Sequence, residues 1–475
     1  MNKTLVQRLA EFASEVSLEQ LPEDVVEDSK RVLLDSIGCA LAGVDEPKSR
    51  IGADLAQLIA GGGDGATIFG TSHRSSVYGA AFANGESINA LDFDSVLPPG
   101  HVAPYVLPGA IAVAEAGHSA GRRVLEAIAV SHEISYRFGR SMDYMRTPKD
   151  GGMDLPEVLG FTSTVFGGAV AVAMLEDQGA EQIAHALGIA GHLTPVNSYR
   201  TWMDNVPNST VKYTMAGPVT QAALTAAHAA RLGHTGDLRI LDDEKYGYRR
   251  FIGSVRWEPS NLVDGLGETW GFPAAHSYKP YPHCRVGHTP LDALNEILGA
   301  HDIAVEEIDA IRCWGEGWVE QPVWLNNDVR HPHEAQFSIA HGLAVGAHRI
   351  PPGPAWQSAE TLSRPSVLAL MEKVTFAPHP DYVQTLSQDP SARPTRVEVD
   401  ARGTTFRAER THPKGTPSAD PSTYLTTDEL VAKFRANASG VLPADRIDEV
   451  VDGVLHLEKI DDVQPLVRAM GTGPR

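Results

Sequence analysis

Apolar side chains recur at helical spacing through the N-terminal half of the chain. Leu5, Leu9 and Phe12 fall on one face of a predicted helix, and a second apolar run begins after Pro22. The same spacing predicts further helices over residues 123–137, 164–175, 181–189 and 210–232. Ala and Gly dominate several of these stretches and charges are few, so we expect a multilayered helical core in which the axes approach closely.

The pattern changes after Pro273. Residues 308–314 and 395–399 alternate between apolar and polar positions as strands do, and residues 401–404 have the composition of a hairpin turn. Helical spacing resumes after Thr426, which heads a capping box. The sequence therefore predicts a mainly α fold with a smaller α+β domain.

Three segments follow from this change of pattern. Residues 1–268 are expected to form the N-terminal part of a helical domain, residues 269–412 an α+β domain, and residues 413–475 helices that rejoin the first domain. The Pro-rich stretch at 410–422 is expected to be an exposed linker.

Composition narrows the class of protein. The 475 residues include three cysteines, Cys39, Cys284 and Cys313, without CxxC spacing, which supports neither a disulfide framework nor a zinc knuckle. No uninterrupted apolar run approaches the roughly 18 residues of a membrane span, and the N-terminus lacks the apolar stretch of a signal peptide. We expect a cytoplasmic protein without a membrane partner.

The charge balance adds a condition on the ligand. The formal net charge is −20, from 60 acidic and 40 basic residues, which argues against a nucleic-acid partner. If the ligand is a carboxylate, basic side chains from distant parts of the chain must converge into a local basic island.

The first candidate site follows an Ala- and Gly-rich segment, residues 79–90, that reads as a buried helix. Asp92 and Asp94 interrupt this helix, and the Pro98-Pro99-Gly100 turn places His101 on a loop before the next apolar helix. Buried carboxylates need partners, and His101 is a candidate. The alternatives are a core imidazole bonded to a backbone carbonyl and an Asp92 that caps the helix.

The second candidate site is the rigid, donor-rich segment 277–285, which contains Lys279, Tyr281, His283 and Arg285. Two prolines fix its backbone, and cationic, aromatic loops of this kind commonly bind anions. Its alternative is a linker with Lys279 in solvent. Cys284 could be a nucleophile, although a single cysteine beside an arginine is more often simply packed.

Lys212 stands at the predicted start of the helix 210–232. The helix dipole opposes a cation in the first turn, so an anionic ligand would explain it, as would a side chain that reaches solvent. Residues 330–338, followed by His341, contain His331, His333 and Glu334, but not at the helical spacing of a zinc protease, so no metal site is predicted. No Gly-rich phosphate loop follows a strand, so a nucleotide cofactor is not supported either.

Taken together, these segments resemble the MmgE/PrpD family, whose members dehydrate, decarboxylate or epimerise small carboxylic acids. The resemblance runs over nearly the whole chain and rests on residues 33–43, Asn84-Gly85, Leu91-Asp92-Phe93-Asp94, His101, Lys212, 279–284 and 334–338. It implies a large helical domain made from both chain ends, a smaller α+β lid, a homodimer, and a site between the domains that uses no cofactor.

By motif match, the family's site residues fall on Asp92, His101, Lys212 and Lys279. Where the family usually has Gly-Phe-His, this chain has Thr162 after Gly160-Phe161, and where a Tyr often follows the Gln-Phe-Ser motif it has His341. A Thr hydroxyl cannot exchange a proton at neutral pH as an imidazole can, so the acid–base set differs. We expect His341 to take part in proton transfer.

Four further residues are expected to bind substrate, namely Thr162, Tyr281, His283 and Arg285. The two lysines would clamp substrate carboxylates and stabilise a developing anion, while His101 would be the acid or base, oriented by Asp92. The first hypothesis is therefore a lyase that dehydrates or decarboxylates a small di- or tricarboxylic acid.

Two alternatives stay open at this point. An epimerase would need two acid–base groups on opposite faces of one carbon, which His101 and His341 could supply. A helical binding scaffold would have kept the fold and lost the chemistry.

Overall fold

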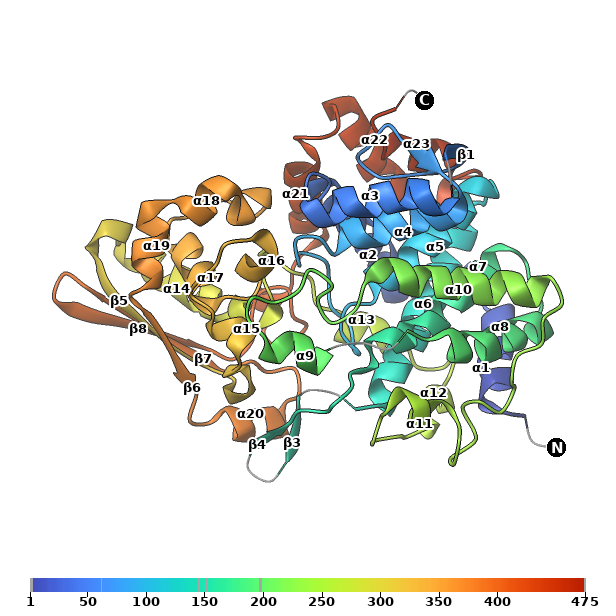
Figure 1. Ribbon diagram of the computed structural model, residues 1–475, viewed down its shortest axis with the longest axis horizontal. Helices are drawn as coiled ribbons and strands as arrows, with labels where there is room; N and C mark the ends of the chain where they lie inside the picture. The colour runs from blue at the N-terminus through green and yellow to red at the C-terminus, as the bar shows by residue number, and fades with distance from the viewer. Residues whose placement is uncertain (1–2, 61, 144–145, 150–151, 196–198, 474–475) are drawn as a thin grey trace.

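The computed structural model describes residues 3–60, 62–143, 146–149, 152–195 and 199–473. These residues form a larger helical body and a smaller lobe that contains a four-stranded sheet (Figure 1). Both ends of the described chain lie in the helical body. None of the described helices is both long enough and apolar enough to cross a lipid bilayer.

The helical body is built mainly from the first half of the chain. Its principal helices are α1 (Leu5–Glu15), α2 (Glu23–Ala42), α3 (Pro47–Ala60), α4 (Val77–Ile88), α5 (Ala103–Ala116), α6 (Gly121–Ser141), α7 (Thr164–Leu175), α8 (Ala180–Leu193) and α10 (Ala216–Arg231). Shorter elements are α9 (Tyr199–Asp204), α11 (Tyr248–Ile252), α12 (Ser260–Val263), α13 (Phe272–Ala275) and the hairpins β1 (Gly62–Thr67) with β2 (Arg74–Ser75) and β3 (Thr147–Lys149) with β4 (Gly152–Asp154).

Small residues let these helices pack closely. All residues of α7 are buried. A Cβ atom added at Gly167 of α7 would lie 2.5 Å from the backbone oxygen of Ser131 in α6, and one at Gly217 of α10 would lie 2.4 Å from the ring of Phe82 in α4. The Ala- and Gly-rich composition is thus required by the close approach of neighbouring helices.

The C-terminal helices pack onto the body, as the fold class predicts. They are α21 (Thr427–Ala438), α22 (Ala444–Leu455) and α23 (Gln464–Ala469), and α21 starts with the predicted capping box. Phe434 of α21 lies against Gly38 of α2, and the Arg31 guanidinium of α2 donates to the Leu425 carbonyl oxygen at 2.5 Å. The core of the body therefore joins residues from both ends of the chain.

The smaller lobe contains the sheet, with strands in the order β6-β5-β7-β8. They are β5 (Ile308–Gly315), β6 (Val374–Pro378), β7 (Thr395–Ala401) and β8 (Thr404–Arg410), with β5 and β6 parallel and the other pairs antiparallel. The helices of this lobe are α14 (His288–His301), α15 (Pro322–Leu325), α16 (Pro332–Ala335), α17 (Ile339–Ala347), α18 (Ala359–Ser363), α19 (Pro365–Met371) and α20 (Tyr382–Gln388). The strands and the hairpin predicted from the sequence are confirmed. Strand β6 was not predicted, because only its first residue is buried and it lacks alternation.

Two expectations about local structure are wrong. The helix predicted over 210–232 begins at Ala216, because Lys212 adopts φ +55°, a left-handed conformation that no helix continues. The Pro-rich stretch 410–422 is not a fully exposed linker. Gly415 and Thr416 are buried, and the Gly415 carbonyl oxygen accepts a hydrogen bond from the Tyr278 N–H.

Candidate active site

The candidate site is centred on a turn that follows α4. Within this turn Asp92 adopts φ +53°, a conformation that is unfavourable for a residue other than glycine. Its side chain is only 1% exposed. A buried carboxylate held in strained backbone requires strong partners, and the surrounding segments provide them.

Two ammonium groups donate hydrogen bonds to the Asp92 carboxylate. Lys279 Nζ donates to Oδ2 at 2.6 Å and to the Asp92 backbone oxygen at 2.8 Å. Lys212 Nζ donates to Oδ1 at 3.2 Å and to the Asn89 backbone oxygen at 2.9 Å. The two lysines, far apart in sequence, therefore meet on one carboxylate.

The charges of this cluster determine its protonation. Burial alone would raise the pKa of Asp92, but the positive charges of Lys279, Lys212 and His101 outweigh it and hold this pKa well below its usual range. Burial lowers the pKa of Lys212 to about 8, partly offset by the negative charge of Asp92. Asp92 is therefore an anion at neutral pH.

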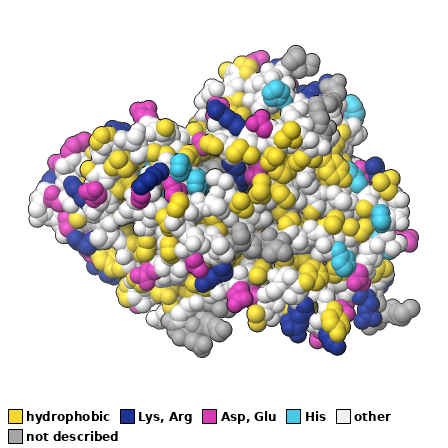
Figure 2. Space-filling view, in the orientation of Figure 1, with side chains coloured by type: hydrophobic (Ala, Val, Ile, Leu, Met, Phe, Trp, Pro, Cys, Tyr) yellow, Lys and Arg dark blue, Asp and Glu magenta, His cyan; other side chains and the backbone are white. Residues whose placement is uncertain are grey.

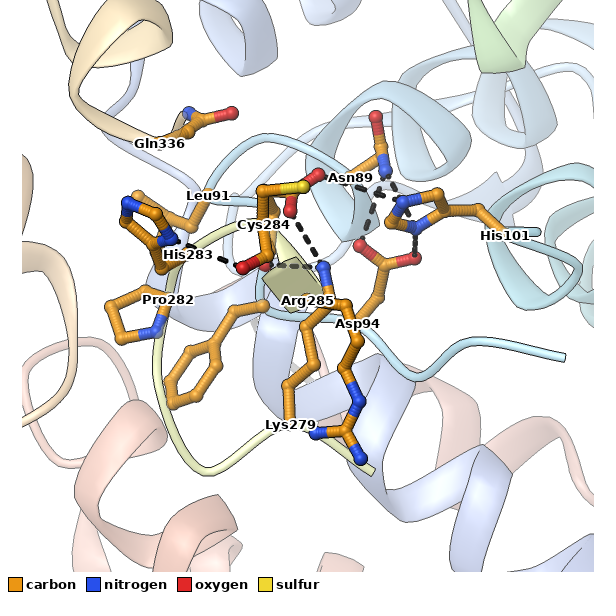
Figure 3. A network of polar contacts seen from close by, with 12 residues as sticks. Asn89, Leu91, Asp94, His101, Lys279, Pro282, His283, Cys284, Arg285 and Gln336 are labelled. Atoms are coloured by element: carbon orange, nitrogen blue, oxygen red, sulfur yellow. Dashed lines mark hydrogen bonds and ion pairs between the residues drawn. The ribbon is translucent and has the colours of Figure 1, made fainter. Parts of the chain in front are cut away.

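A second carboxylate holds the histidine. His101 lies on the loop before α5, as predicted, and its Nδ1–H donates to Asp94 Oδ2 at 2.6 Å (Figure 3). Asn89 Nδ2 donates to the other oxygen of Asp94 at 3.1 Å. His101 Nε2 lies 3.5 Å from Asp92 Oδ1. The expectation that Asp92 orients His101 needs correction, because Asp94 bonds Nδ1.

Side chains from distant segments hold the whole turn. Five consecutive backbone carbonyl oxygens, from Asn89 to Phe93, each accept a hydrogen bond from such a side chain. The donors, in order, are Lys212, Gln336, Gln357, Lys279 and Lys433. The two glutamines come from the smaller lobe and Lys433 from α21, so both lobes and the C-terminal helices fix the strained backbone.

A cavity of about 600 Å³ opens beside this turn, and Asp92, His101 and Lys279 line it. Tyr213 also lines it and stacks on His101 with ring centroids 5.6 Å apart, and Phe161 stacks on Tyr213 at 4.5 Å. Apolar walls and a few polar groups are typical of a small-molecule site.

The cavity is also the local basic island that the charge balance requires of a carboxylate site. Besides Lys279, five arginines from separate parts of the sequence line it, namely Arg140, Arg146, Arg256, Arg285 and Arg393. On the face of the molecule shown in Figure 2, basic side chains lie scattered over the surface and interspersed with acidic ones. Basic residues therefore converge at this cavity in a chain of net charge −20.

Five of the predicted site residues are not among the described residues that line the cavity. Lys212 is one of them, and its ammonium group bonds Asp92 and the Asn89 carbonyl oxygen. Thr162 is fully buried beside Phe161. Tyr281 donates to Asp292 Oδ1 at 2.8 Å and stacks on Trp356, both within the smaller lobe. His283 Nε2–H donates to the Ser338 backbone oxygen at 3.0 Å, and burial lowers the pKa of its imidazole.

His341 is the fifth of these residues. It lies on α17, the helix that packs against His283, and burial lowers the pKa of His341 to about 3. The structure thus gives no geometric support for proton transfer by His341 or for substrate binding by Thr162, Tyr281 and His283.

Two neighbours in the 277–285 segment do line the cavity. Cys284 accepts a hydrogen bond from Trp324 Nε1 at 3.4 Å, and burial raises the pKa of its thiol, which disfavours the reactive thiolate. Arg285 is buried, with its guanidinium against the backbone of Tyr278. Within the described residues, no group of three His, Cys, Asp or Glu side chains could hold a metal ion.

Sequence reasoning missed the supporting residues. Asp94 stands two positions after Asp92 and seven before His101. The sequence therefore shows two carboxylates near His101, but it does not show which of them bonds the imidazole. Tyr213 follows Lys212 directly. Gln336 lies in a motif that the sequence analysis noted, but nothing local predicts that its amide reaches the carbonyl of residue 90.

Comparisons with known proteins identify the family of the chain. The model of the MmgE/PrpD N-terminal domain matches residues 7–260, and the model of the C-terminal domain matches residues 281–457. The chain belongs to the MmgE/PrpD family. A cis-aconitate decarboxylase of Aspergillus terreus is 24% identical over 496 residues, covering 97% of this chain and 95% of the relative.

Two mammalian family members are similarly distant. The cis-aconitate decarboxylase of Mus musculus is 24% identical and covers 99% of this chain and 94% of the relative. The cis-aconitate decarboxylase of Homo sapiens is 25% identical, and the match covers 98% of this chain and 94% of the relative. The similarity to these cis-aconitate decarboxylases therefore extends over nearly the full length of both chains.

Proposed function

We propose that this protein is a lyase that removes carbon dioxide from a small di- or tricarboxylic acid without a cofactor. One observation carries the proposal. Lys279 and Lys212 grip the Asp92 carboxylate, and the Nε2 atom of His101 stands 3.5 Å from it in the wall of a cavity. Cationic donors beside an imidazole suit a reaction that creates negative charge on carbon.

In this proposal Lys279 receives the developing charge. An ammonium group has three N–H donors, and the described residues accept two of those of Lys279. Because Lys279 belongs to the cavity wall, the proposal assigns the third donor to the substrate. When the bond to the departing carboxylate breaks, carbon dioxide leaves and the electron pair moves into the neighbouring unsaturated carboxylate. The ammonium group stabilises the resulting enediolate-like anion.

His101 then supplies a proton to carbon. Asp94 keeps the Nδ1–H, so the protonated imidazole donates from Nε2 and regains its proton from water. Lys212, which bonds Asp92 and the Asn89 carbonyl, positions Asp92 beside this imidazole. Dehydration would use the same groups, with His101 removing a proton and hydroxide leaving, but the named relatives favour decarboxylation.

Epimerisation is less well supported by the geometry. Its second acid–base group was expected to be His341, yet His101 is the one histidine among the described residues that line the cavity. Proton return to the opposite face of a carbon therefore lacks an evident donor.

The test is a screen of di- and tricarboxylic acids with three readouts. Release of carbon dioxide indicates decarboxylation, absorbance of a new alkene without gas indicates dehydration, and deuterium exchange without net conversion indicates epimerisation. With the acid that reacts, Lys279→Gln should lower kcat by about 10²- to 10³-fold, as does loss of a group that stabilises an anion.

Lys245→Gln, which removes an exposed lysine far from the cavity, is the matched control. If the parent turns over no acid, and binding of the acids is unchanged in His101→Ala and Lys212→Ala, only the scaffold alternative remains.

We also propose that the protein works in the cytoplasm as a homodimer, as the family resemblance implies. The subunit mass is 51.0 kDa. Size-exclusion chromatography with light scattering should therefore give about twice this mass at micromolar concentration. A mass of one subunit at every concentration would contradict the dimer.

A further inference from the structure

Arg285 is a buried cation in the wall of the cavity, outside the cluster at Asp92. It is 5% exposed, and its Nη1 lies 3.4 Å from the Tyr278 carbonyl oxygen, 3.2 Å from the Lys414 carbonyl oxygen and 3.2 Å from His288 Nδ1. Its Nη2 donates to the Thr416 hydroxyl. All these partners are neutral acceptors.

No carboxylate among the described residues lies within ion-pair distance of Arg285, whereas other buried cations of this site have one. Lys279 and Lys212 pair with Asp92, and Lys433 pairs with Asp35 at 2.7 Å. A buried charge without a counter-charge is costly. The cost falls when an anion binds beside it.

The surroundings of Arg285 contain two more arginines, which share the single carboxylate of Glu316 at 2.9 and 2.8 Å. Arg146 and Arg393 line the same cavity, and burial together with their charges lowers the pKa of Arg285 to about 9. The Lys279 ammonium bonds the oxygens of Asp92, and in Figure 3 the Arg285 guanidinium lies apart from these bonds, at the lower edge of the group. The cavity thus has one cationic end at the reaction cluster and a second at Arg285.

The aromatic part of the cavity wall suits an apolar segment of a ligand. Trp202, Trp318 and Trp324 line the cavity together with Tyr136 and Phe337. Its volume of about 600 Å³ lies in the range of about 300 to 1,000 Å³ that holds drug-sized ligands, and exceeds the need of a compact acid.

We propose that Arg285 forms a second anion subsite, so that the substrate is an acid whose distal anionic group binds Arg285 while an apolar segment spans the cavity to Lys279. This inference rests on the proposed function for the reacting end. Binding of the distal anion needs no turnover, so it can be measured separately.

The experiment compares suberate with octanoate, which have the same chain length but carry two carboxylates and one. Dissociation constants are measured by titration calorimetry for the parent and for Arg285→Gln. The substitution should weaken suberate binding by about 10- to 100-fold, the value of a hydrogen-bonded charge, and change octanoate binding by less than about twofold. Lys279→Gln should weaken both acids.

Two further variants keep the result interpretable. Arg285→Lys retains the charge and should recover part of the suberate affinity, with an unchanged unfolding midpoint. Arg50→Gln removes an exposed charge from α3 and should leave both affinities unchanged. The subsite is overturned if the parent does not bind suberate, if Arg285→Gln leaves suberate binding intact, or if it weakens both acids equally, as a structural residue would.

The same measurements distinguish failure of the proposed lyase function from failure of the Arg285 subsite. If no acid is turned over but suberate binding depends on Arg285, the lyase proposal is wrong and the subsite stands. If longer diacids are decarboxylated equally well by the parent and by Arg285→Gln, the lyase stands and the subsite is wrong.

Discussion

At the scale of single residues, two carboxylates near His101 have different partners. Asp94 bonds the imidazole Nδ1–H, whereas Asp92 pairs with Lys279 and Lys212 and lies near Nε2. The Asp94 carboxylate accepts the Nδ1–H bond and so fixes the ring orientation, which leaves Nε2 for proton donation. Asp92 sets the positions of the cationic groups.

Asp94→Asn should therefore damage turnover more than binding. The amide no longer forces the Nδ1–H tautomer or holds the ring orientation as the carboxylate does, so kcat should fall by about 10²- to 10⁴-fold while KM changes by less than about threefold. Steady-state kinetics on the acid found in the screen measures this split. Asp309→Asn, at an exposed position of β5, is the control, and an equal loss of kcat in both variants would contradict the assignment.

The pH dependence should report Lys212. Burial lowers the folded-state pKa of Lys212 from its ordinary value of 10.5 to about 8, so the ammonium group loses its proton as pH rises through 8 and its bond to Asp92 weakens. Activity should then fall along a basic limb near pH 8. Lys212→Arg, which stays charged, should move this limb to higher pH, and an unmoved limb would exclude Lys212 as its origin.

Stability should respond to the same group in the opposite sense. Between pH 8 and 10.5 the unfolded chain binds more protons at Lys212 than the folded protein does, so this group's contribution to stability rises with pH. Chemical denaturation of the parent and Lys212→Met across this window measures the difference. A parent that loses stability relative to Lys212→Met as pH rises would contradict the sign.

At the scale of elements, α21 reaches the reaction turn from the far end of the chain. Lys433 pairs with Asp35 of α2 at 2.7 Å, donates to the Phe93 carbonyl oxygen at 2.9 Å, and lies 3.8 Å from the Phe93 ring centroid. Removal of this cation leaves Asp35 buried without its counter-charge. The loss therefore acts on both stability and the position of the turn.

Lys433→Met should lower the free energy of unfolding by about 3 to 5 kcal/mol, as does breaking a buried ion pair. Urea denaturation measures this, and a double variant with Asp35→Leu should recover part of the loss. Arg435→Ala breaks an exposed pair on the same helix and should cost less than about 1 kcal/mol. Equal losses in the two single variants would rule out a special role for Lys433.

Elements were predictable from the sequence wherever local periodicity decides them. Helix α1 has its apolar residues on one face, and strand β7 alternates between buried and partly exposed positions. The start of α10 was not predictable from the sequence. The left-handed turn at Lys212 is held by hydrogen bonds to Asn89 and Asp92, which no local pattern encodes. The sequence identified Asp92, His101 and the two lysines as candidate site residues. It did not predict how they pair, or that Thr162 and His341 lie outside the cavity lining, because tertiary contacts decide both.

At the scale of the whole molecule, the core of the helical body depends on both ends of the chain. Phe434, Ile447, Val450 and Leu457 belong to the same buried cluster as residues of α1 and α2. Separation of the C-terminal helices would expose this apolar surface to water.

A chain that ends at residue 412 should therefore not fold cooperatively. Differential scanning calorimetry should show no sharp transition for the truncated chain, whereas the full chain should unfold cooperatively. Expression of residues 413–475 as a second polypeptide should restore part of the soluble yield. A truncated chain with the transition temperature of the parent would contradict a shared core.

The row of carbonyls from Asn89 to Phe93 has a consequence for assembly. The five donor side chains come from the loop before α10, the smaller lobe, the segment between the lobes and the C-terminal helices. All five are therefore distant in sequence from the turn whose carbonyl oxygens they bond. The reactive geometry can therefore exist only once every part of the chain has docked. Recovery of activity during refolding should be the last signal to appear, after secondary structure and compaction, which makes turnover itself a reporter of complete maturation.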